Sequence, residues 1–271
     1  MPATRATDGT RIFYDTFGQP DGEPLVLVMG LAVDRWGWVR QRSTLAKHFR
    51  CISIDNRGAG LSDKPYGNYD LFTMATDIEA VMDAEGIESA HIMGYSLGGV
   101  LAQVLAVTAP QRVRSLVLAS TACRVKDWRR EVLAEWSQLV EARGVRVFAQ
   151  ENLRWVAAAR HLRWITPLAP AFAPLMVRAP AHGVRGQIHA IASITEQLHD
   201  ELRAVTVPTL VLVGSQDILT PVADSEEIAH RIRSARLQVI SGAAHGAVVT
   251  DARVFNSACE VFLTEQIGTR V

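Results

Sequence analysis

The chain has 271 residues, a length that allows one large α/β domain or two smaller domains. Hydrophobic residues make up 48% of it and charged residues 21%, which predicts a folded protein with a large core and excludes an intrinsically disordered one. The 28 lysines and arginines balance the 28 aspartates and glutamates, so the composition gives no general attraction to nucleic acid or to an anionic membrane.

The apolar segments and the cysteines of the sequence indicate in which cellular compartment the protein is expected. The N-terminal residues contain no apolar segment of signal-peptide length, and no run of about 18 apolar residues occurs in the sequence. Three cysteines, Cys51, Cys123 and Cys259, are widely spaced and lack the pairing that is typical of zinc or dithiol sites. We therefore expect a cytoplasmic protein with reduced thiols, no metal site and no membrane partner.

In chain order, short β-branched or apolar runs alternate with longer stretches of helical period. This alternation predicts a mostly parallel sheet with helices on its faces. The runs expected to form strands are residues 11–17, 24–29, 51–55, 90–95, 115–120, 208–214 and 236–241.

A serine follows the strand expected at residues 90–95, within the sequence GYSLG at residues 94–98. Apolar residues then recur at helical spacing from Leu97 until Pro110 stops the pattern. Ser96 is therefore expected on a strand-to-helix turn, and G-x-S-x-G in that context is typical of a nucleophile elbow. We predict that Ser96 is a nucleophile. The alternative is that the glycines only relieve packing between strand and helix.

The alternation of strands stops between residues 123 and 203. This segment contains no convincing strand and holds four of the six tryptophans of the chain. Residues 128–144 have the pattern of an amphipathic helix that ends near Gly144, and several prolines divide the rest of the segment into shorter pieces. We expect residues 123–203, called the insert below, to form a helical cap. Residues 1–122 and 204–271 would then make one discontinuous core domain.

A serine nucleophile needs a base and an orienting acid, which in this motif come in the order serine, acid, histidine. The strand expected at residues 208–214 leads to Asp217, and the last expected strand leads to His245 in a small loop. We predict Asp217 as the acid and His245 as the general base. Asp217 could instead cap its turn or the helix expected from Val222. Asp224 further along that helix is expected on its solvated side.

The same chemistry needs donors for an oxyanion and walls for a pocket. Gly30 permits a tight turn after the strand at residues 24–29, and we expect the backbone N–H groups of Leu31 and Leu97 to form an oxyanion hole. For any single tryptophan of the insert, packing against the core is the favoured interpretation, whereas at least one of Trp36 and Trp38 could edge the pocket. The candidate pocket residues are Gly30, Trp36, Trp38, Tyr95, Trp128, Trp136, Trp155 and Trp164.

These motifs together resemble the α/β-hydrolase fold family over nearly the whole chain outside the insert. The likeness rests on GYSLGG at the elbow, IDNRGAGLSDKP after an early strand, LVGSQDILTP around Asp217 and GAAHGAVV around His245. The resemblance implies an eight-stranded, mostly parallel sheet flanked by helices and a mainly structural role for residues 56–63. Family members often have His-Gly where this chain has Met29-Gly30.

Within that family the chain is most similar to serine esterases and enol-lactonases. The resemblance implies hydrolysis of a small carboxylic ester or lactone through an acyl-enzyme intermediate, without a cofactor, by a monomer or small homo-oligomer. Family members with an aspartate nucleophile, such as haloalkane dehalogenases and epoxide hydrolases, are disfavoured by Ser96. Cofactor-free haloperoxidases or perhydrolases and carbon-carbon bond hydrolases stay open as alternatives. A ligand-sensing protein that keeps the hydrolase shell is an alternative of another class.

Overall fold

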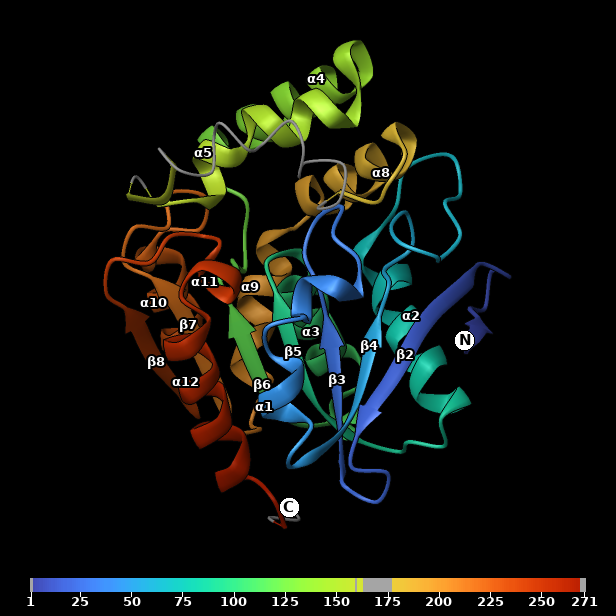
Figure 1. Cartoon of the computed structure of the whole chain (residues 1–271), viewed down its shortest axis with the longest axis vertical. Coiled ribbons are helices and arrows are strands. Elements are labelled where there is room, and N and C mark those ends of the chain that lie inside the picture. Colours follow the sequence, from blue (N-terminus) through green and yellow to red (C-terminus); the bar gives the residue numbers. More distant parts are fainter. Residues whose placement is uncertain (1, 159, 163–176, 269–271) are drawn as a thin grey trace.

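An eight-stranded sheet runs through the protein in the order β1-β2-β4-β3-β5-β6-β7-β8 (Figure 1). The structure is a computed structural model that describes residues 2–158, 160–162 and 177–268. β2 pairs antiparallel with β1 and with β4, and every other neighbouring pair is parallel. The strands are β1 (Ala3–Arg5), β2 (Arg11–Gly18), β3 (Glu23–Val28), β4 (Phe49–Ile54), β5 (Ala90–Tyr95), β6 (Val113–Ala119), β7 (Thr209–Gly214) and β8 (Ala235–Ile240).

The predicted fold class is confirmed. All seven runs expected to form strands do so, with ends within two residues of those expected. The eighth strand, β1, was not among them. It has three residues, Ala-Thr-Arg, of which none is buried, so it lacks the apolar pattern that reveals a strand.

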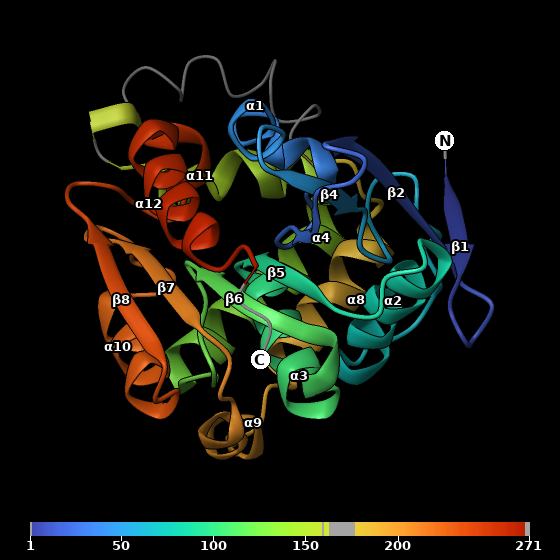
Figure 2. The same cartoon turned by 90° about the horizontal axis from the view of Figure 1, so that it is seen from below.

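Two hydrophobic clusters occupy the two faces of the sheet. Alternation along β3 sends Val26 and Val28 to one cluster and Leu25 and Leu27 to the other. Figure 2 shows the sheet between its two layers of helices, with α1, α11 and α12 on one face and α2, α3, α9 and α10 on the other. These helices are α1 (Arg42–Leu45), α2 (Leu71–Ala84), α3 (Leu97–Thr108), α9 (Glu196–Glu201), α10 (Val222–Arg231), α11 (Ala247–Thr250) and α12 (Ala252–Glu265). Short 3-10 turns are η1 (Arg35–Trp38), η2 (Pro110–Arg112) and η4 (Leu202–Ala204).

The insert connects β6 to β7, and part of its described chain forms helices above the carboxyl ends of the parallel strands (Figure 1). These helices include α4 (Asp127–Glu151), α5 (Leu153–Val156) and α8 (Ala181–Ala192). The described part of residues 123–203 contains no strand. The last helix of the insert, α9, lies instead beside α3 and α10 on a face of the sheet.

The first helix of the insert is longer than expected. Gly144 has a non-helical backbone (φ 79°, ψ 168°), and the helical pattern does stop there. The chain then re-enters a helix that continues to Glu151. Phe148 explains the return, because its ring is buried against Trp136 with 5.6 Å between ring centroids. Packing of the second half against the first therefore overrides the stop signal at glycine.

The start of α3 lies so close to the sheet that side chains are excluded. A Cβ atom on Gly98 would lie 2.0 Å from the carbonyl oxygen of Val28 at the end of β3. A Cβ atom on Gly94 would lie 2.2 Å from the carbonyl oxygen of Gly98. Both obstacles are backbone atoms, which cannot turn aside as a flexible side chain can. Glycine at these positions therefore sets the distance between β3, β5 and α3.

A buried ion pair attaches the insert to α10, and it corrects one prediction. Asp224 was expected on the solvated side of its helix, but it is only 1% exposed. Lys126 Nζ lies 2.8 Å from its Oδ1, and the buried Arg129 pairs with its other oxygen. The guanidinium of Arg129 also donates to the Leu219 carbonyl at 3.0 Å. Asp224 and Arg129 are 95 residues apart in sequence, so no local pattern reveals the pair.

We expect Gly98→Ala to lower the free energy of unfolding by about 3 kcal/mol, because the new methyl group overlaps a backbone carbonyl of β3. Equilibrium unfolding in urea measures the change. Gly86→Ala is the control, since Gly86 has a left-handed backbone (φ 66°) but an added methyl group there would have no atom within 4 Å. It should cost about 1 kcal/mol from backbone strain alone. Equal losses in the two variants would contradict the close-approach argument.

Asp224→Asn should lower the free energy of unfolding by about 3 to 5 kcal/mol, because Arg129 would stay buried without an anionic partner. Glu226→Gln is the matched control, since Glu226 is an exposed carboxylate on the same helix. It should change the free energy by less than about 0.5 kcal/mol. Urea unfolding of both variants measures the difference, and a mild effect of Asp224→Asn would show that the pair contributes little.

Candidate active site

Ser96 occupies the turn between β5 and α3 in a strained conformation. Its backbone lies at φ 55° and ψ −118°, a region that residues other than glycine rarely adopt. Hydrogen bonds on both sides hold it: its N–H donates to the Ala119 carbonyl at 2.9 Å, and Thr121 Oγ1 donates to its carbonyl at 2.8 Å. The side chain is half-buried at the carboxyl end of the sheet, before the first turn of α3.

Three residues from distant parts of the chain form a hydrogen-bonded row. His245 Nε2 lies 3.2 Å from Ser96 Oγ, and His245 Nδ1 lies 2.9 Å from Asp217 Oδ2. Asp217 and His245 are 4% and 3% exposed, so the row is largely shielded from water. This is the arrangement that a serine nucleophile, a histidine base and an orienting carboxylate require. The catalytic roles of the three residues stay a prediction at this point.

Asp217 makes both sets of contacts that its position suggested. Its Oδ1 accepts the backbone N–H groups of Leu219 at 3.0 Å and Thr220 at 2.8 Å, so the side chain does cap its turn. Its Oδ2 faces His245 and also accepts from Thr220 Oγ1 at 2.8 Å. The two interpretations of this aspartate are therefore compatible, because one carboxylate has enough acceptor sites for both.

Thr220 is a site residue that sequence reasoning missed. Its Oγ1 lies 3.2 Å from His245 Nδ1 as well as next to the carboxylate. The hydroxyl thus contacts the histidine and the acid at once. The threonine stands three residues after Asp217 in the same turn, which is the only signal in the sequence that could have found it.

The environment keeps the acid ionised. Burial by itself would raise the pKa of Asp217, but the charge of His245 and the hydrogen bonds from His245 and Thr220 outweigh burial and lower the pKa below its usual value. A carboxylate with these partners can stabilise a positive charge on the adjacent imidazole.

Tyr95 supports the loop between β8 and α11 that carries His245, residues 241–246, called the histidine loop below. Its hydroxyl donates to the His245 carbonyl, and the two ring centroids lie 5.4 Å apart. Burial, together with the charge of Asp217, raises the pKa of Tyr95 well above its usual value, so the phenol keeps its proton and remains a donor. Trp38 packs edge-on against the tyrosine ring at 6.4 Å between centroids.

The structure corrects part of the predicted pocket lining. Trp38 is completely buried in the cluster under α1 and α12, so it does not line a pocket. Trp136 is 8% exposed and packs against Phe148 and Trp155 within the insert, as the packing alternative expected. Trp128 and Trp36 are 37% and 46% exposed and lie against arginines.

Trp155 and Trp164 are the remaining tryptophans among the candidate pocket residues. Trp155 is half-buried, and its Nε1 has no hydrogen-bond partner among the described residues. The next residue, Val156, accepts a hydrogen bond from the N–H of Gly246 at 2.6 Å, which brings α5 against the histidine loop. Trp164 lies outside the described residues, so its place in a pocket stays a prediction.

The turn after β3 lies next to the serine. A Cβ atom on Gly30 would be 3.1 Å from Ser96 Cβ, so the turn and the serine are in direct contact. Asn56 Nδ2 donates to the Met29 carbonyl at 2.8 Å and holds the start of this turn. In the described part of the chain, no hydrogen bond takes up the N–H of Leu31 or of Leu97. Both groups are therefore free to bind an oxygen atom of a ligand, as an oxyanion hole requires.

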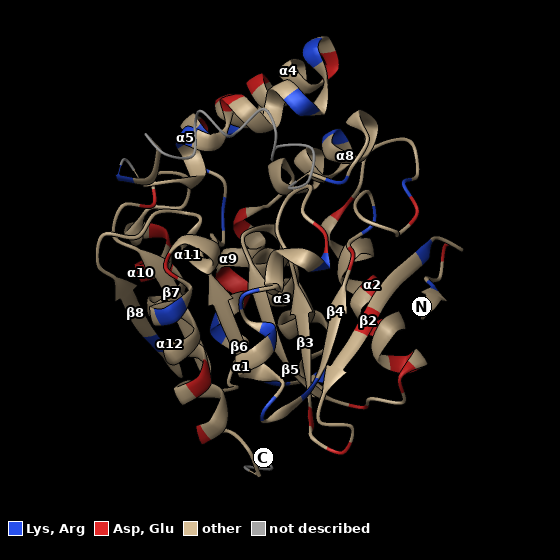
Figure 3. Cartoon of the chain, in the orientation of Figure 1, with Lys and Arg blue, Asp and Glu red and all other residues tan. Residues whose placement is uncertain are grey.

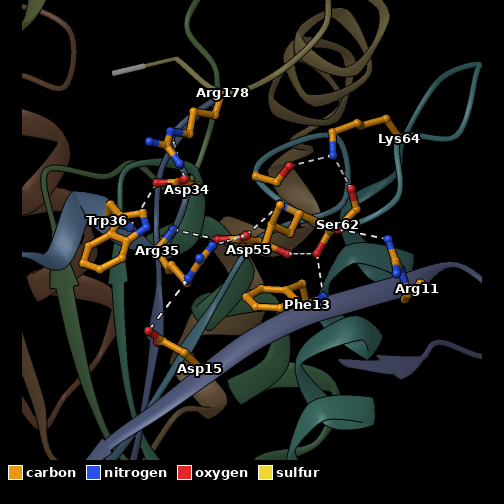
Figure 4. A network of polar contacts seen from close by, with 12 residues as sticks. Arg11, Phe13, Asp15, Asp34, Arg35, Trp36, Asp55, Ser62, Lys64 and Arg178 are labelled. Carbon is orange, nitrogen blue, oxygen red and sulfur yellow. Dashed lines mark hydrogen bonds and ion pairs between the residues drawn. The ribbon is translucent and has the colours of Figure 1, made fainter. Parts of the chain in front are cut away.

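A buried carboxylate joins the loops that flank this turn (Figure 4). Asp55 accepts the backbone N–H of Arg35 and its guanidinium, both at 2.8 Å, as well as the N–H of Leu61 at 2.8 Å. Its carbonyl accepts from Ser62 Oγ, which in turn accepts the N–H of Phe13 at 2.7 Å. The segment at residues 55–63 thus links η1 to β2, which fits the structural role expected for it.

Acidic and basic residues are intermixed over the helices and loops, and most of the sheet carries neither (Figure 3). Among the described residues, no group of three or more His, Cys, Asp or Glu side chains could hold a metal ion. None of the described helices combines the length and hydropathy that a bilayer span requires.

None of the three thiols is part of the hydrogen-bonded row of Asp217, His245 and Ser96. Cys51, Cys123 and Cys259 are all free and buried. Burial raises the pKa of Cys51 and of Cys123 to about 12 and raises that of Cys259 further. They therefore stay protonated at neutral pH.

Comparison with known proteins identifies the family. The family model described as alpha/beta hydrolase fold matches residues 23–252. The 3-oxoadipate enol-lactonase 2 of Acinetobacter baylyi is 30% identical over 256 residues, which cover 92% of each chain. The crystal structure of the enol-lactonase from Burkholderia xenovorans LB400 has a TM-score of 0.90 at 27% identity and covers 97% of this chain and 100% of that chain. A thermophilic esterase from Thermogutta terrifontis has a TM-score of 0.88 at 26% identity, over 98% of this chain and 99% of that chain. The chain therefore belongs to the alpha/beta hydrolase fold family, as its motifs implied.

Proposed function

We propose that this hydrolase acts on small carboxylic esters or lactones with Ser96 as its nucleophile. The observation that carries the proposal is the row of hydrogen bonds from Asp217 through His245 to Ser96, at 2.9 and 3.2 Å. The strained backbone of Ser96 supports it, because strain of this kind is maintained at functional sites by the structure around it. The similarity to two enol-lactonases and an esterase supports the substrate class.

The proposed reaction has two halves. In the first, His245 takes the proton of Ser96 Oγ while that oxygen attacks the carbonyl carbon, and the protonated imidazole then gives its proton to the leaving alkoxide. In the second, His245 takes a proton from water while the water oxygen attacks the acyl-enzyme carbonyl carbon. The bond from that carbon to Ser96 Oγ then breaks, and the protonated imidazole gives its proton to Ser96 Oγ, which releases the acid and restores the free enzyme. Asp217 holds the imidazole through Nδ1 in both halves and stabilises its charged form.

The oxyanion of each tetrahedral intermediate would be bound by the N–H groups of Leu31 and Leu97. Leu97 is the first residue of α3, so the positive end of the helix dipole adds to its hydrogen bond. Losing one donor of this kind typically costs about 3 kcal/mol of transition-state stabilisation. All groups in this mechanism belong to the protein, so it needs no cofactor.

We further propose that the insert, residues 123–203, acts as a cap on a core of residues 1–122 and 204–271. The position of α4, α5 and α8 above the carboxyl ends of the strands supports this division (Figure 1). The hydrogen bond from Gly246 to Val156 supports it as well, because it joins the insert to the histidine loop. The covering part of the insert ends before α9, which packs with α3 and α10.

Ser96→Ala should lower the turnover of p-nitrophenyl esters or of lactones about 10⁶-fold, because the nucleophile is lost. A fluorophosphonate should label the wild type at Ser96, as read by mass spectrometry, and leave the variant unlabelled. Ser89→Ala is the matched control, since Ser89 is a half-buried serine at the other end of β5. It should keep both activity and labelling.

Three other results, from assays of the wild type with further substrates, would replace the proposal. Peroxide-dependent halogenation without ester or lactone hydrolysis would indicate a haloperoxidase or perhydrolase. Turnover confined to carbon-carbon bonds of diketones would indicate a carbon-carbon bond hydrolase. Ligand binding without any turnover or labelling would indicate a ligand-sensing protein.

Asp217→Asn should lower kcat about 10⁴-fold, because an amide no longer fixes the imidazole tautomer or stabilises its charge. Asp127→Asn, a change at an exposed carboxylate in α4, is the control and should keep kcat. The lowered pKa of Asp217 adds a second expectation for the wild type. Its carboxylate stays ionised while the base titrates, so the acid limb of log kcat/KM against pH should have a slope of about one. A slope near two would mean that the acid titrates together with the base.

A further inference from the structure

The turn that would bear the oxyanion-binding N–H has an unusual second half. Ala32, directly after Leu31, has a left-handed backbone (φ 61°) although it is not glycine, and it is completely buried. Such a conformation costs free energy and persists only when neighbouring groups enforce it. Its N–H donates to Gln187 Oε1 at 2.7 Å. Gln187 lies in α8, so a side chain of the insert reaches the turn at residues 29–32, called the oxyanion turn below.

Gln187 is itself fixed at both ends of its amide. Its Nε2 donates to the Arg57 carbonyl at 2.8 Å, and the whole residue is 0% exposed. The Arg57 side chain is held by Asp77 through two hydrogen bonds of 2.6 Å. The amide is therefore not free to rotate, because its oxygen and its nitrogen each have a buried partner.

Close packing fixes the helix that carries the glutamine. A Cβ atom on Gly183 would lie 2.4 Å from the carbonyl oxygen of Gly58, so α8 meets the loop after β4 backbone to backbone. One turn later, a Cβ atom on Gly186 would lie 2.8 Å from the ring of Tyr69. The amide of Gln187 therefore sits at a fixed distance from the core.

Two side-chain amides enclose one peptide group of the turn. Asn56 holds the carbonyl of Met29, in the peptide before Gly30, and Gln187 holds the N–H of Ala32, in the peptide after Leu31. The peptide between them joins Gly30 to Leu31 and contains the N–H predicted to bind the oxyanion. With both neighbouring peptides held, this group has little freedom to rotate away from Ser96.

We propose that Gln187 is a positioning residue, which holds the oxyanion turn in its working geometry from the insert. The inference rests on the function proposed above. It makes stabilisation of the transition state depend on a residue that touches neither the substrate nor Ser96. Binding of the uncharged substrate would depend on it much less, because no oxyanion exists in that state.

The test compares Gln187→Met with the wild type. Methionine has a similar length but cannot hold Ala32 or Arg57. We expect kcat for p-nitrophenyl butyrate to fall about tenfold to 100-fold and KM to change less than about threefold. The fall in kcat should not exceed the fall caused by losing a whole oxyanion donor, because the N–H of Leu31 is still present. Affinity for trifluoroacetophenone, which forms a tetrahedral adduct with a serine, should fall by the same factor as kcat/KM. Affinity for p-nitrophenyl butyrate in a Ser96→Ala background should stay unchanged.

Two further variants separate positioning from folding. Thr209→Val is the control: Thr209 is 0% exposed and donates from Oγ1 to the Val207 carbonyl at 3.0 Å at the start of β7, the end of that strand opposite the site, so its loss disturbs a hydrogen bond of a buried side chain away from the turn. It should lower Tm but keep the ratio of adduct affinity to substrate affinity. Gln187→Glu keeps the shape, and its buried protonated carboxyl can replace both hydrogen bonds. Its activity relative to the wild type should therefore fall as the pH rises and the carboxyl ionises.

Several results would overturn the inference. One is an active wild type together with a Gln187→Met variant of unchanged kcat and unchanged adduct affinity. Another is a variant whose Tm falls while the ratio of adduct affinity to substrate affinity stays that of the wild type. If Gln187→Met does not fold, a constant activity ratio of Gln187→Glu to wild type across pH overturns it as well. A wild type that neither hydrolyses esters or lactones nor reacts with a fluorophosphonate refutes the proposed function itself, which distinguishes the two failures.

Discussion

The first turn of α3 lies against the ends of β3 and β5 at a separation that leaves no room for a Cβ atom, and the geometry of the candidate site depends on this contact. Ser96 must then bridge strand and helix within one residue, which forces its left-handed backbone. The turn after β3 is brought beside the serine by the same approach, as the contact of Gly30 with Ser96 shows. The serine and the turn are thus placed by backbone packing, before any polar contact is made.

Polar contacts then fix what packing alone cannot. The acid, the base and the turn each sit on a loop, where backbone conformations are less restricted than in a strand. Each loop is held by a side chain: Thr220 holds Asp217, Tyr95 holds the carbonyl of His245, and Asn56 holds the carbonyl of Met29. Residues that carry no chemistry of their own therefore determine the geometry of those that are proposed to carry it.

Sequence reasoning succeeded where local pattern and structure coincide. The core strands are continuous apolar runs, and Ser96, Asp217 and His245 each come shortly after one of them. Order along the chain, together with the G-x-S-x-G motif, was therefore enough to predict that these three residues lie together. It failed where a residue's surroundings come from a remote segment. Asp224 has the spacing of an exposed helical residue, and only Arg129 and Lys126 make it a buried one. In the same way, the burial of Trp38 away from a pocket depends on a hydrophobic cluster that distant elements of the chain form together.

The buried thiols have a consequence for the chemoselectivity of the protein. A cysteine reacts with electrophiles as its thiolate, and burial holds Cys51, Cys123 and Cys259 in the protonated form. In free solution a thiol is the stronger nucleophile, so the proposed function would reverse the usual order of reactivity in favour of the half-buried Ser96 hydroxyl beside His245. The core thus protects its sulfur atoms from alkylation and oxidation by the same exclusion of water that stabilises the fold.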